Sequence, residues 1–222
     1  MERHVLNPAN VANWRRSLQL LAVVSLIGCG PDPAADNHAK AIAVLERAGE
    51  GAPFADASTA ERAAIRHEPS GMVCVLPRDG PFDLAAFPAT AANPGAYCST
   101  VTGGVAAAVV AVRFVATNLD RAFAEALAES AGRASPQPWT GEPSDADKSS
   151  PEGLPHFRIA RFEATIDGSP HYLRVAMSET RGWYLQQIVS APLDRGEAAE
   201  AEAGTAWRGL LAEFAAQPPA AE

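Results

Sequence analysis

The chain has 222 residues, of which 47% are hydrophobic and 20% charged, and its formal net charge at pH 7 is −8. This length and hydrophobic content are enough for one folded domain with a sizeable core. The acidic balance gives no electrostatic basis for binding phosphate backbones, so we expect no nucleic-acid partner.

The N-terminal segment has the pattern of a secretory leader. Arg15 and Arg16 precede a mostly apolar run at 18–27, and a positive region followed by about 7–15 apolar residues is typical of exported proteins. The run is shorter than the ~20 apolar residues that a transmembrane helix needs, and the Gly-Pro-Asp-Pro sequence at 30–33 would break a continuing helix. Residues 1–28 are therefore predicted to be a signal peptide.

The sequence Leu26-Ile27-Gly28-Cys29 closes the apolar run and resembles the lipobox of bacterial lipoproteins. The resemblance implies that the Cys29 thiol is diacylated, that the leader is cut before it, and that the new amine is acylated. More than one acyl chain gives stable membrane anchoring, at about 0.8 kcal/mol per buried methylene. The following Gly30 favours, by the same resemblance, the outer membrane over the inner one. The alternatives are an ordinary signal peptide with an incidental cysteine and a twin-arginine signal, which residues 17–19 fit poorly.

Two cysteines remain after the leader. Removing residues 1–28, with three arginines and one glutamate, takes the formal net charge from −8 to −10 and leaves Cys74 and Cys98. An even number of cysteines in an exported chain predicts a disulfide, which would close a loop of about 25 residues and contribute about 3–4 kcal/mol in the chain-entropy model. The alternatives are two separate buried thiols and a zinc pair, which lacks a second ligand at suitable spacing.

The mature chain is expected to begin with a flexible tether and a helix at 36–48, where apolar residues recur at helical spacing. Ser58 and Glu61 match a capping box, which predicts a short helix to Ile65. The resulting domain boundaries are 29–66 for the tether and N-terminal helix, 67–217 for an α+β domain and 218–222 for a tail.

The first half of the predicted domain is rich in strand formers. The expected strands are 72–76, 82–87, 97–102 and 105–115. Thr117 and Asp120 then begin a helix that Gly132 ends. Residues 134–155, rich in Pro, Gly and Ser, are predicted to form a long mobile loop around Trp139.

The second half predicts a strand meander and a closing helix. Strands at 156–166 and 171–178 flank a turn at 167–170, in a register that pairs Glu163 with Arg174 on one face and apolar residues on the other. A three-residue loop, Thr180-Arg181-Gly182, leads to a third strand that ends at Pro192. The last helix, 195–216, is expected to lie on the sheet through four apolar residues: Trp207, Leu210, Leu211 and Phe214.

No motif specifies a reaction. There is no G-x-S-x-G sequence, and nothing marks Ser70 before Gly71 as a nucleophile. The Gly103-Gly104 pair lacks the wider pattern of a phosphate loop and predicts a turn. Four histidines stand at no metal-ligand spacing and are expected at the surface or at strand ends: His38, His67, His156 and His171. We predict no catalytic residue, metal or cofactor.

One group of basic residues is of interest because its members stand on predicted strands: Arg113, Arg158 or Arg161, and Arg174. They would be able to line an anion-binding face. The preferred interpretation is that they form the solvated side of a one-sided sheet, balanced by acids such as Glu163.

Several packing sequences carry a resemblance across residues 68–215. They are Ser70-Gly71-Met72-Val73-Cys74, Leu76-Pro77, Gly182-Trp183-Tyr184-Leu185, Ala191-Pro192 and the closing Trp-Leu-Leu helix. In style the chain resembles uncharacterised exported lipoproteins of alphaproteobacterial type, and in element order it is similar to the PsbP-like α/β sandwich. The resemblance implies an antiparallel sheet of about five to seven strands, covered by N-terminal, middle and C-terminal helices.

These observations predict a lipid-anchored envelope protein, in the periplasm or at the outer membrane, held there through Cys29. PsbP-like domains are mostly binding and assembly modules, so the resemblance implies a non-enzymatic interaction or assembly role with an envelope protein partner. The alternatives are a periplasmic protein that binds a small anionic ligand and an unrecognised hydrolase, which would place a histidine or carboxylate of perturbed pKa in a cleft.

Overall fold

The structure, a computed structural model, describes residues 32–49, 51–87, 94–113, 118–131, 136–148 and 153–216. These residues lie within one compact unit, Pro31–Glu222. The predicted signal peptide and Cys29 lie outside the described residues. Among the described residues, no helix is long and apolar enough to cross a membrane.

The main sheet has seven antiparallel strands in the order β4-β5-β6-β10-β9-β8-β7. Their bounds are Phe82–Phe87 (β4), Gly95–Thr102 (β5), Val105–Val112 (β6), Gln137–Pro138 (β7), Phe157–Ile166 (β8), Ser169–Thr180 (β9) and Trp183–Pro192 (β10). Most pairs are neighbours in the chain, and β6 with β10 joins the two halves of the sheet. The predicted α+β fold class is confirmed.

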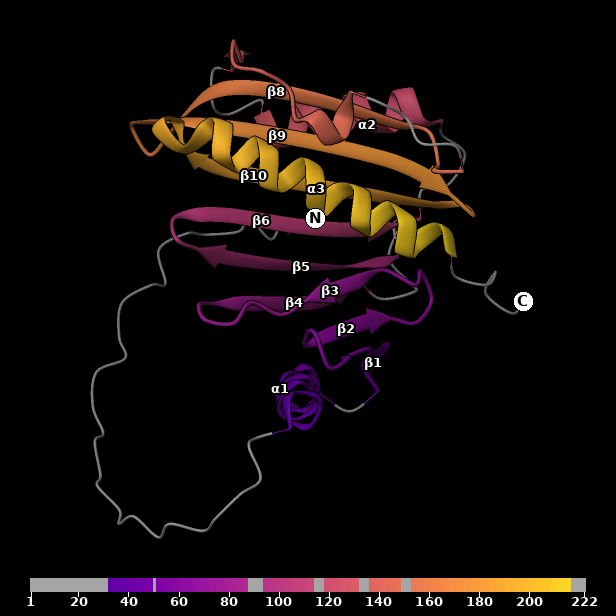
Figure 1. The fold of residues 1–222 in the computed structure, drawn as a ribbon. Helices are drawn as coiled ribbons and strands as arrows, with labels where there is room; N and C mark the ends of the chain where they lie inside the picture. The colour runs from indigo at the N-terminus through magenta and orange to yellow at the C-terminus, as the bar shows by residue number, and fades with distance from the viewer. Residues whose placement is uncertain are drawn as a thin grey trace, which may run out of the picture. The chain divides into compact units, whose positions relative to one another are not determined.

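Two helices lie on opposite faces of this sheet (Figure 1). The C-terminal helix α3 (Gly196–Ala216) follows a short 3₁₀ turn, η2 (Leu193–Arg195), and contacts β9 and β10. The middle helix α2 (Leu119–Ala131) contacts β8 and β9 from the other side. Because β9 is covered on both faces, the predicted one-sided sheet with a solvated arginine face is wrong.

A smaller sheet and the first helix complete the unit. Strands β1 (Phe54–Asp56), β2 (Ala64–His67) and β3 (Val73–Val75) pair antiparallel in that order. Helix α1 (Pro33–Ala48) contacts β1 and β2 and buries Ala41 and Val44, and its N-cap Asp32 accepts a hydrogen bond from the Ala34 amide at 3.0 Å. Because β2 crosses the predicted boundary between residues 66 and 67, α1 and the small sheet belong to the folded domain and not to a separate tether segment.

The predicted short helix from Ser58 to Ile65 is wrong. Ile65 is fully buried in β2, and the Ser58 hydroxyl accepts a hydrogen bond from the Ala64 amide at 3.1 Å. The serine therefore satisfies the backbone at the start of a strand rather than the first turn of a helix, a competition that is general for Ser side chains in turns.

The disulfide joins the two sheets. Cys74 on β3 and Cys98 on β5 are bonded, as predicted, with their Cα atoms 6.2 Å apart. Both cysteines are buried beside Met72 and Trp207 in the main apolar core. The crosslink thus holds the small sheet against the face of the main sheet that α3 also covers.

The β8–β9 hairpin has a tighter turn than the sequence predicts. Asp167 and Gly168 adopt φ of 49° and 79°, which makes a two-residue turn and brings Ile166 opposite Ser169. The pairing is shifted by two residues, so every side chain keeps its predicted face while its partner changes. Arg174 lies opposite Arg161, and the predicted Glu163–Arg174 pair is wrong.

The described part of the predicted long loop, residues 136–148, packs on the sheet and on α3. It contains β7, which pairs with β8, and the 3₁₀ turn η1 (Asp145–Asp147). Trp139 lies edge-on to Tyr172, with ring centroids 4.9 Å apart. Gly204 of α3 lies so close that an added Cβ would be 2.3 Å from the Ser144 Oγ. A glycine at 204 therefore permits the close approach of the loop to the helix.

Candidate functional site

The most densely connected polar group of the described chain lies between the sheet and α3. Arg161 on β8 and Arg174 on β9 are directly opposite each other and point to the α3 side. Two like charges at this position would repel each other. Their presence in neighbouring strands requires anionic partners from outside the sheet.

Asp147 of η1 and Glu200 of α3 supply those partners. Arg161 donates to Asp147 Oδ2 at 2.6 Å and to Glu200 Oε1 at 2.7 Å. Arg174 donates to the same Asp147 oxygen at 2.6 Å and to Glu200 Oε2 at 3.0 Å. Two cations and two carboxylates therefore form one closed set, which we call the arginine–carboxylate cluster.

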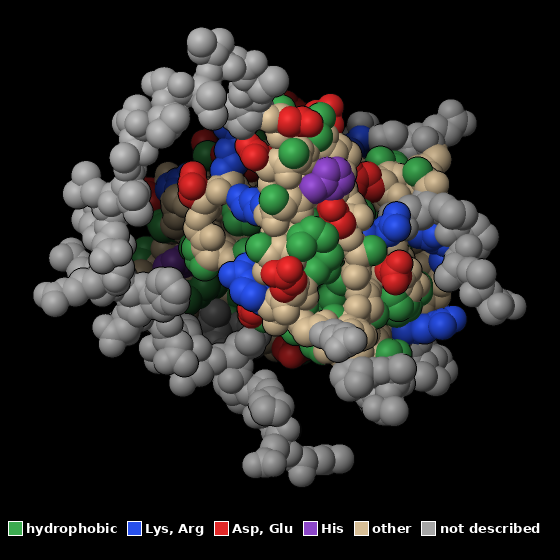
Figure 2. Space-filling view, turned by 90° about the horizontal axis from the view of Figure 1, so that it is seen from below, with side chains coloured by type: hydrophobic (Ala, Val, Ile, Leu, Met, Phe, Trp, Pro, Cys, Tyr) green, Lys and Arg blue, Asp and Glu red, His purple; other side chains and the backbone are tan. Residues whose placement is uncertain are grey.

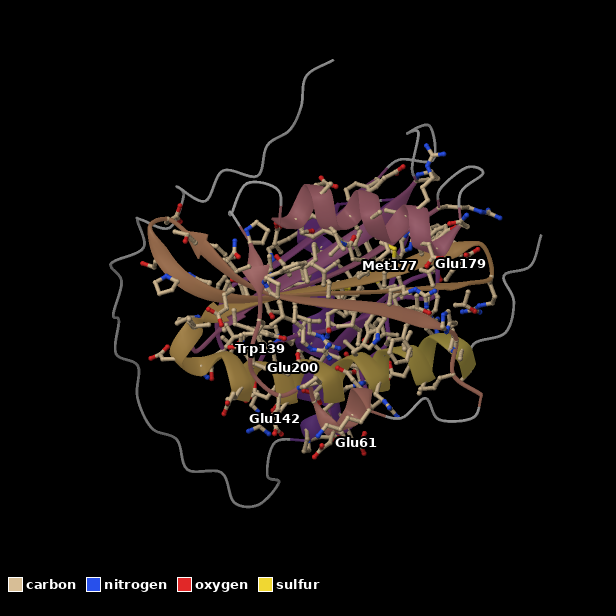
Figure 3. The ribbon with its side chains drawn as sticks, turned by 90° about the horizontal axis from the view of Figure 1, so that it is seen from above. Glu61, Trp139, Glu142, Met177, Glu179 and Glu200 are labelled. Atoms are coloured by element: carbon tan, nitrogen blue, oxygen red, sulfur yellow. A yellow bond between two sulfur atoms is a disulfide. The ribbon has the colours of Figure 1, made fainter. Side chains whose placement is uncertain are left out.

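The cluster is shielded from solvent. The side chains of Arg174 and Glu200 are 0% and 1% exposed, and those of Asp147 and Arg161 are 5% and 17% exposed. Figure 3 shows Glu200 on α3, with Met177 on the opposite side of the sheet near α2. Burial makes each ion pair electrostatically strong but also makes an unpaired member very costly.

Further hydrogen bonds satisfy the remaining polar atoms of Glu200 and Arg174. The Ser144 amide donates to Glu200 Oε1 at 2.8 Å, and the Tyr172 hydroxyl donates to Glu200 Oε2. Arg174 Nε donates to Gln187 Oε1 at 3.3 Å, and the Gln187 amide donates in turn to the Ala203 carbonyl. The cluster thus connects β8, β9, β10, α3 and the 136–148 segment.

These contacts set the ionisation of the cluster. Burial alone would raise the pKa of Glu200, but the Ser144 amide, the Tyr172 hydroxyl and the arginines outweigh it and lower that pKa below its ordinary value. Burial opposes the charge on Arg174, yet Asp147 and Glu200 raise the pKa of this guanidinium. Burial and the adjoining Glu200 raise the pKa of the Tyr172 hydroxyl. Glu200 and Arg174 are therefore ionised at neutral pH, and Tyr172 acts as a hydrogen-bond donor.

The structure separates the four arginines that the sequence grouped together. Arg161 and Arg174 meet in the cluster, whereas Arg158 lies on the other face of β8 and donates to Asp120 of α2 at 2.9 Å. Arg113 follows the end of β6, with its guanidinium 5.9 Å from the centre of the Trp183 ring. They do not form one anion-binding face, because alternate residues of a strand point to opposite sides.

The histidines occupy unrelated places. His38 is paired with Asp56 at the surface. The Nδ1 atom of His171 lies 3.0 Å from the Ser169 carbonyl oxygen, and the His156 ring contacts the Arg158 guanidinium. His67 ends β2, in agreement with the predicted strand-end placement, but it is buried: it is 3% exposed, and its Nδ1 lies 2.7 Å from the Ser70 hydroxyl. Among the described residues, no three His, Cys, Asp or Glu side chains gather as a group that could hold a metal ion.

The burial of His67 has a clear electrostatic consequence. Burial lowers the pKa of its imidazole to about 4, because the charged form would lose its hydration. The ring packs between Phe54 and Trp183, with centroid distances of 5.4 Å and 5.8 Å. Ser70 also accepts the Met72 amide at 3.1 Å, so the pair fastens the turn between β2 and β3. This environment is that of a packed core histidine rather than of a base in a cleft.

An open hollow lies beside the cluster, along the outer side of β8. Its volume is 380 Å³. Its lining combines apolar residues (Pro143, Phe157 and Ile159) with charged ones (Asp147, Lys148, Arg158 and Arg161). The Arg158 side chain turns to Asp120 on the other face of β8, and Arg161 is paired with Asp147 and Glu200. Lys148 is therefore the cation of this lining whose partner, Asp145, is itself an exposed surface residue.

Glu200 and Asp147 were not among the residues predicted from the sequence. Glu200 had a usable signal, because it lies seven residues before Trp207 and continues the buried stripe of α3 through Ala203 and Gly204. A glutamate inside such a stripe needs a buried cation as a partner. Asp147, in the predicted loop, had no comparable signal.

No protein-family model matches the chain, and no curated protein matches it. Among solved structures, the chain has a likeness to PA94 of Pseudomonas aeruginosa, a protein of unknown function described as a candidate regulator. The two are 17% identical, the match covers 66% of this chain and 90% of that one, and the TM-score is 0.24. A likeness at this level carries no argument about function.

Proposed function

We propose that this chain is a lipid-anchored protein of the bacterial envelope, whose folded part is a non-enzymatic interaction or assembly module. The observation that carries the proposal is the buried disulfide between Cys74 and Cys98. Structural disulfides persist in exported proteins and are rare in the reducing cytosol. The bridge therefore supports export, and export is the condition under which Cys29 would be acylated.

The start of the folded domain lies close in sequence to the proposed anchor. Asp32, the N-cap of α1, is only three residues after Cys29. An extended chain covers at most about 3.5 Å per residue, so three residues reach about 10 Å. A protein anchored in this way is held at the membrane surface, where it is placed to contact other envelope components.

The arrangement of charges favours an interaction module over the anionic-ligand alternative. Asp147 and Glu200 neutralise Arg161 and Arg174, the two most buried arginines of the proposed anion-binding face. An anion would have to displace a buried carboxylate to reach either guanidinium, at the cost of leaving that carboxylate unpaired. The cluster is better suited to holding the 136–148 segment and α3 in fixed positions.

The surface at the α1 end has a mixed character that suits a protein held close to a membrane without inserting into it. Figure 2 shows acidic and basic side chains interspersed with hydrophobic ones on this side. Charges of both signs keep a surface hydrated and soluble. The proposed anchoring therefore depends on the acyl chains of Cys29.

Replacing Cys29 tests the anchor. With Cys29→Ser, the full-length protein is expected to leave the membrane fraction and to lose the mass of the acyl chains, because serine cannot form the thioether. The matched control is Cys74→Ser with Cys98→Ser, which is expected to keep the protein membrane-bound. If Cys29→Ser remains equally membrane-bound with unchanged processing, the lipid-anchor proposal fails.

Purification of the tagged full-length protein from membranes tests the module. A stoichiometric envelope partner is the expected result, and thermal-shift screening against small anions provides the contrasting measurement. A specific anion that raises the melting temperature by mass action would favour the ligand-binding alternative instead.

A further inference from the structure

One edge of the main sheet is incompletely paired within the described residues. β7 pairs with β8 only at Phe162 and Glu163, and one further bond runs from the Trp139 amide to the Arg161 carbonyl. The preceding part of β8, residues 157–160, pairs with β9 on one side and has no strand on its other side among the described ranges. Within that part of the chain, this stretch is therefore an open edge.

The direction of the backbone groups on this edge follows from the Arg161 bond. Because the Arg161 carbonyl points away from β9 and the pattern repeats every two residues, Ile159 and Phe157 also direct their amide and carbonyl groups outward. The side chains of these three residues line the hollow described above. The edge thus combines unpaired backbone groups with an adjoining apolar and cationic surface.

The opposite edge of the sheet differs. The Val101 amide donates to the Pro81 carbonyl, so by the same alternation Leu84 of β4 points its amide outward. That amide donates to the Asp83 carboxylate at 3.1 Å, and the other Asp83 oxygen accepts the Tyr97 hydroxyl. A side chain thus occupies the β4 edge, as is common where proteins protect their edge strands.

We propose that residues 157–160 of β8 receive an extended peptide segment of a protein partner, which adds a strand to the sheet. The segment would place two side chains, two residues apart, into the hollow: one apolar, against Phe157 and Ile159, and one carboxylate, near Lys148. Backbone hydrogen bonds supply affinity in such complexes, and the alternate side chains supply specificity. This inference rests on the proposed module function and names the surface that performs it.

Charge identifies the occupant. Of the cations in the lining of the hollow, Lys148 is the one that neither joins the arginine–carboxylate cluster nor turns to α2. Lys148 is paired with Asp145, whose side chain is 94% exposed, so an incoming carboxylate competes for this lysine at little cost. Extended segments with a carboxylate are therefore favoured over neutral or basic ones.

The probe is an acetylated and amidated peptide, Thr-Val-Thr-Asp-Thr, added to the isotope-labelled full-length protein in detergent micelles. The amide signals of Phe157, Ile159 and Arg161 are expected to shift on titration, with much smaller shifts along β4. A version with lysine in place of aspartate is expected to bind at least about ten-fold more weakly, roughly the effect of reversing one charge at a partly buried site. In a third peptide, a free C-terminal carboxylate replaces the aspartate side chain. Comparing its affinity with that of the first peptide tests whether the partner binds through an internal segment or through its C-terminus.

Two variants of one position isolate the backbone contribution. Ile159→Pro removes the outward amide but no bond to β9, so it is compatible with an edge strand. Ile159→Ala removes the same side chain and keeps the amide. We expect the proline variant to bind the peptide at least about ten-fold more weakly than the alanine variant, as the loss of one backbone bond implies.

A charge variant and its control complete the test. Lys148→Glu is expected to weaken binding several-fold, whereas Arg47→Glu, the same charge change on α1, is expected to leave it unchanged. Equal affinities of the two Ile159 variants, larger shifts on β4 than on β8, or no shift at millimolar peptide would each overturn the proposal. Cys29→Ser is expected to bind the peptide normally, so failure of the anchor and failure of the β8 edge are separate results.

Discussion

Helix α3 covers two regions of very different chemistry. Its C-terminal half places Trp207, Leu211 and Phe214 on an apolar core that includes the Cys74–Cys98 disulfide. Its N-terminal half places Glu200 in the arginine–carboxylate cluster. The apolar half is held by area-dependent, non-directional contacts and one covalent bond. The charged half is held by a few directional contacts, all of which must be present together.

The difference between the regions lies in how they tolerate change. Apolar packing loses energy in proportion to the atoms removed and the cavity left behind. In a buried charged set, removal of one member leaves the others unpaired, while replacement of the whole set by apolar groups is often neutral. The charged half therefore specifies the position of η1 and β8 more than it contributes net stability.

The largest effect is expected when one member of the cluster is removed. Glu200→Ala leaves Arg161 and Arg174 with one carboxylate between them, and loss of a buried partner costs about 3–5 kcal/mol of unfolding free energy. Urea unfolding measures the change. Glu202→Ala, at an exposed position of the same helix, is the control and is expected to stay within about 0.5 kcal/mol.

A double variant tests whether Arg174 and Glu200 depend on each other. Arg174→Met combined with Glu200→Leu is expected to cost clearly less than the sum of the two single variants, because the mutual dependence of the pair is removed. Additive costs would show that the two side chains contribute independently and would remove the contrast between the regions.

The disulfide is expected to have the next largest effect. Replacing Cys74 and Cys98 together by alanine opens a loop of about 25 residues and lowers the unfolding free energy by about 3–4 kcal/mol in the chain-entropy model. Denaturant unfolding under oxidising conditions measures the loss. Two titratable thiols in the denatured, unreduced protein would contradict the bridge itself.

His67 predicts a pH dependence in the region joined to the disulfide. Its pKa is about 4 in the folded protein against an ordinary 6.5, so the unfolded chain binds more protons between these values. The stabilisation that comes from the neutral His67 is therefore fully present above pH 6.5. As the pH falls from 6.5 toward 4, the free energy of unfolding is expected to decrease by on the order of 3 kcal/mol. His67→Phe keeps an aromatic ring in the same place but removes the titrating group. The unfolding free energy of this variant is expected to change less between pH 6.5 and 4, whatever its absolute value.

The cluster predicts a second decrease in stability, at a lower pH than the one caused by His67. The pKa of Glu200 is below its ordinary 4.5, so its stabilisation is present above that value and is lost as the pH falls through the lowered pKa. Unfolding curves recorded at closely spaced pH values tell the two windows apart. A Glu200→Gln variant whose stability falls just as steeply below pH 4.5 would assign that window to other carboxylates.

The smallest effect is expected at the exposed counterpart of the cluster. Arg158 is three residues from Arg161 on the same strand but faces α2, where it pairs with the 73% exposed Asp120. Because solvent screens such pairs, Asp120→Ala is expected to cost less than about 1 kcal/mol. A cost near that of Glu200→Ala would mean that burial does not distinguish the two faces of β8.

Local residue patterns were enough to predict several elements of the fold. Strand-forming runs gave β4 and β10, helical spacing of Trp207, Leu211 and Phe214 gave α3, and the even cysteine count gave the bridge. The faces of the β8–β9 hairpin also follow from alternation alone. These features depend on residues within a few positions of one another, or on a count.

Which charges meet depends on the packing of segments that are distant in the chain. The tight turn at Asp167 shifted the hairpin by two residues and set Arg174 opposite Arg161, and their carboxylates came from η1 and α3, 14 to 39 residues away in the chain. No local pattern encodes a contact at such separations, because the energy of a buried charge depends on every group that surrounds it. The same reason placed Arg161 and Arg174, two arginines of the predicted solvated face, in the interior of the domain.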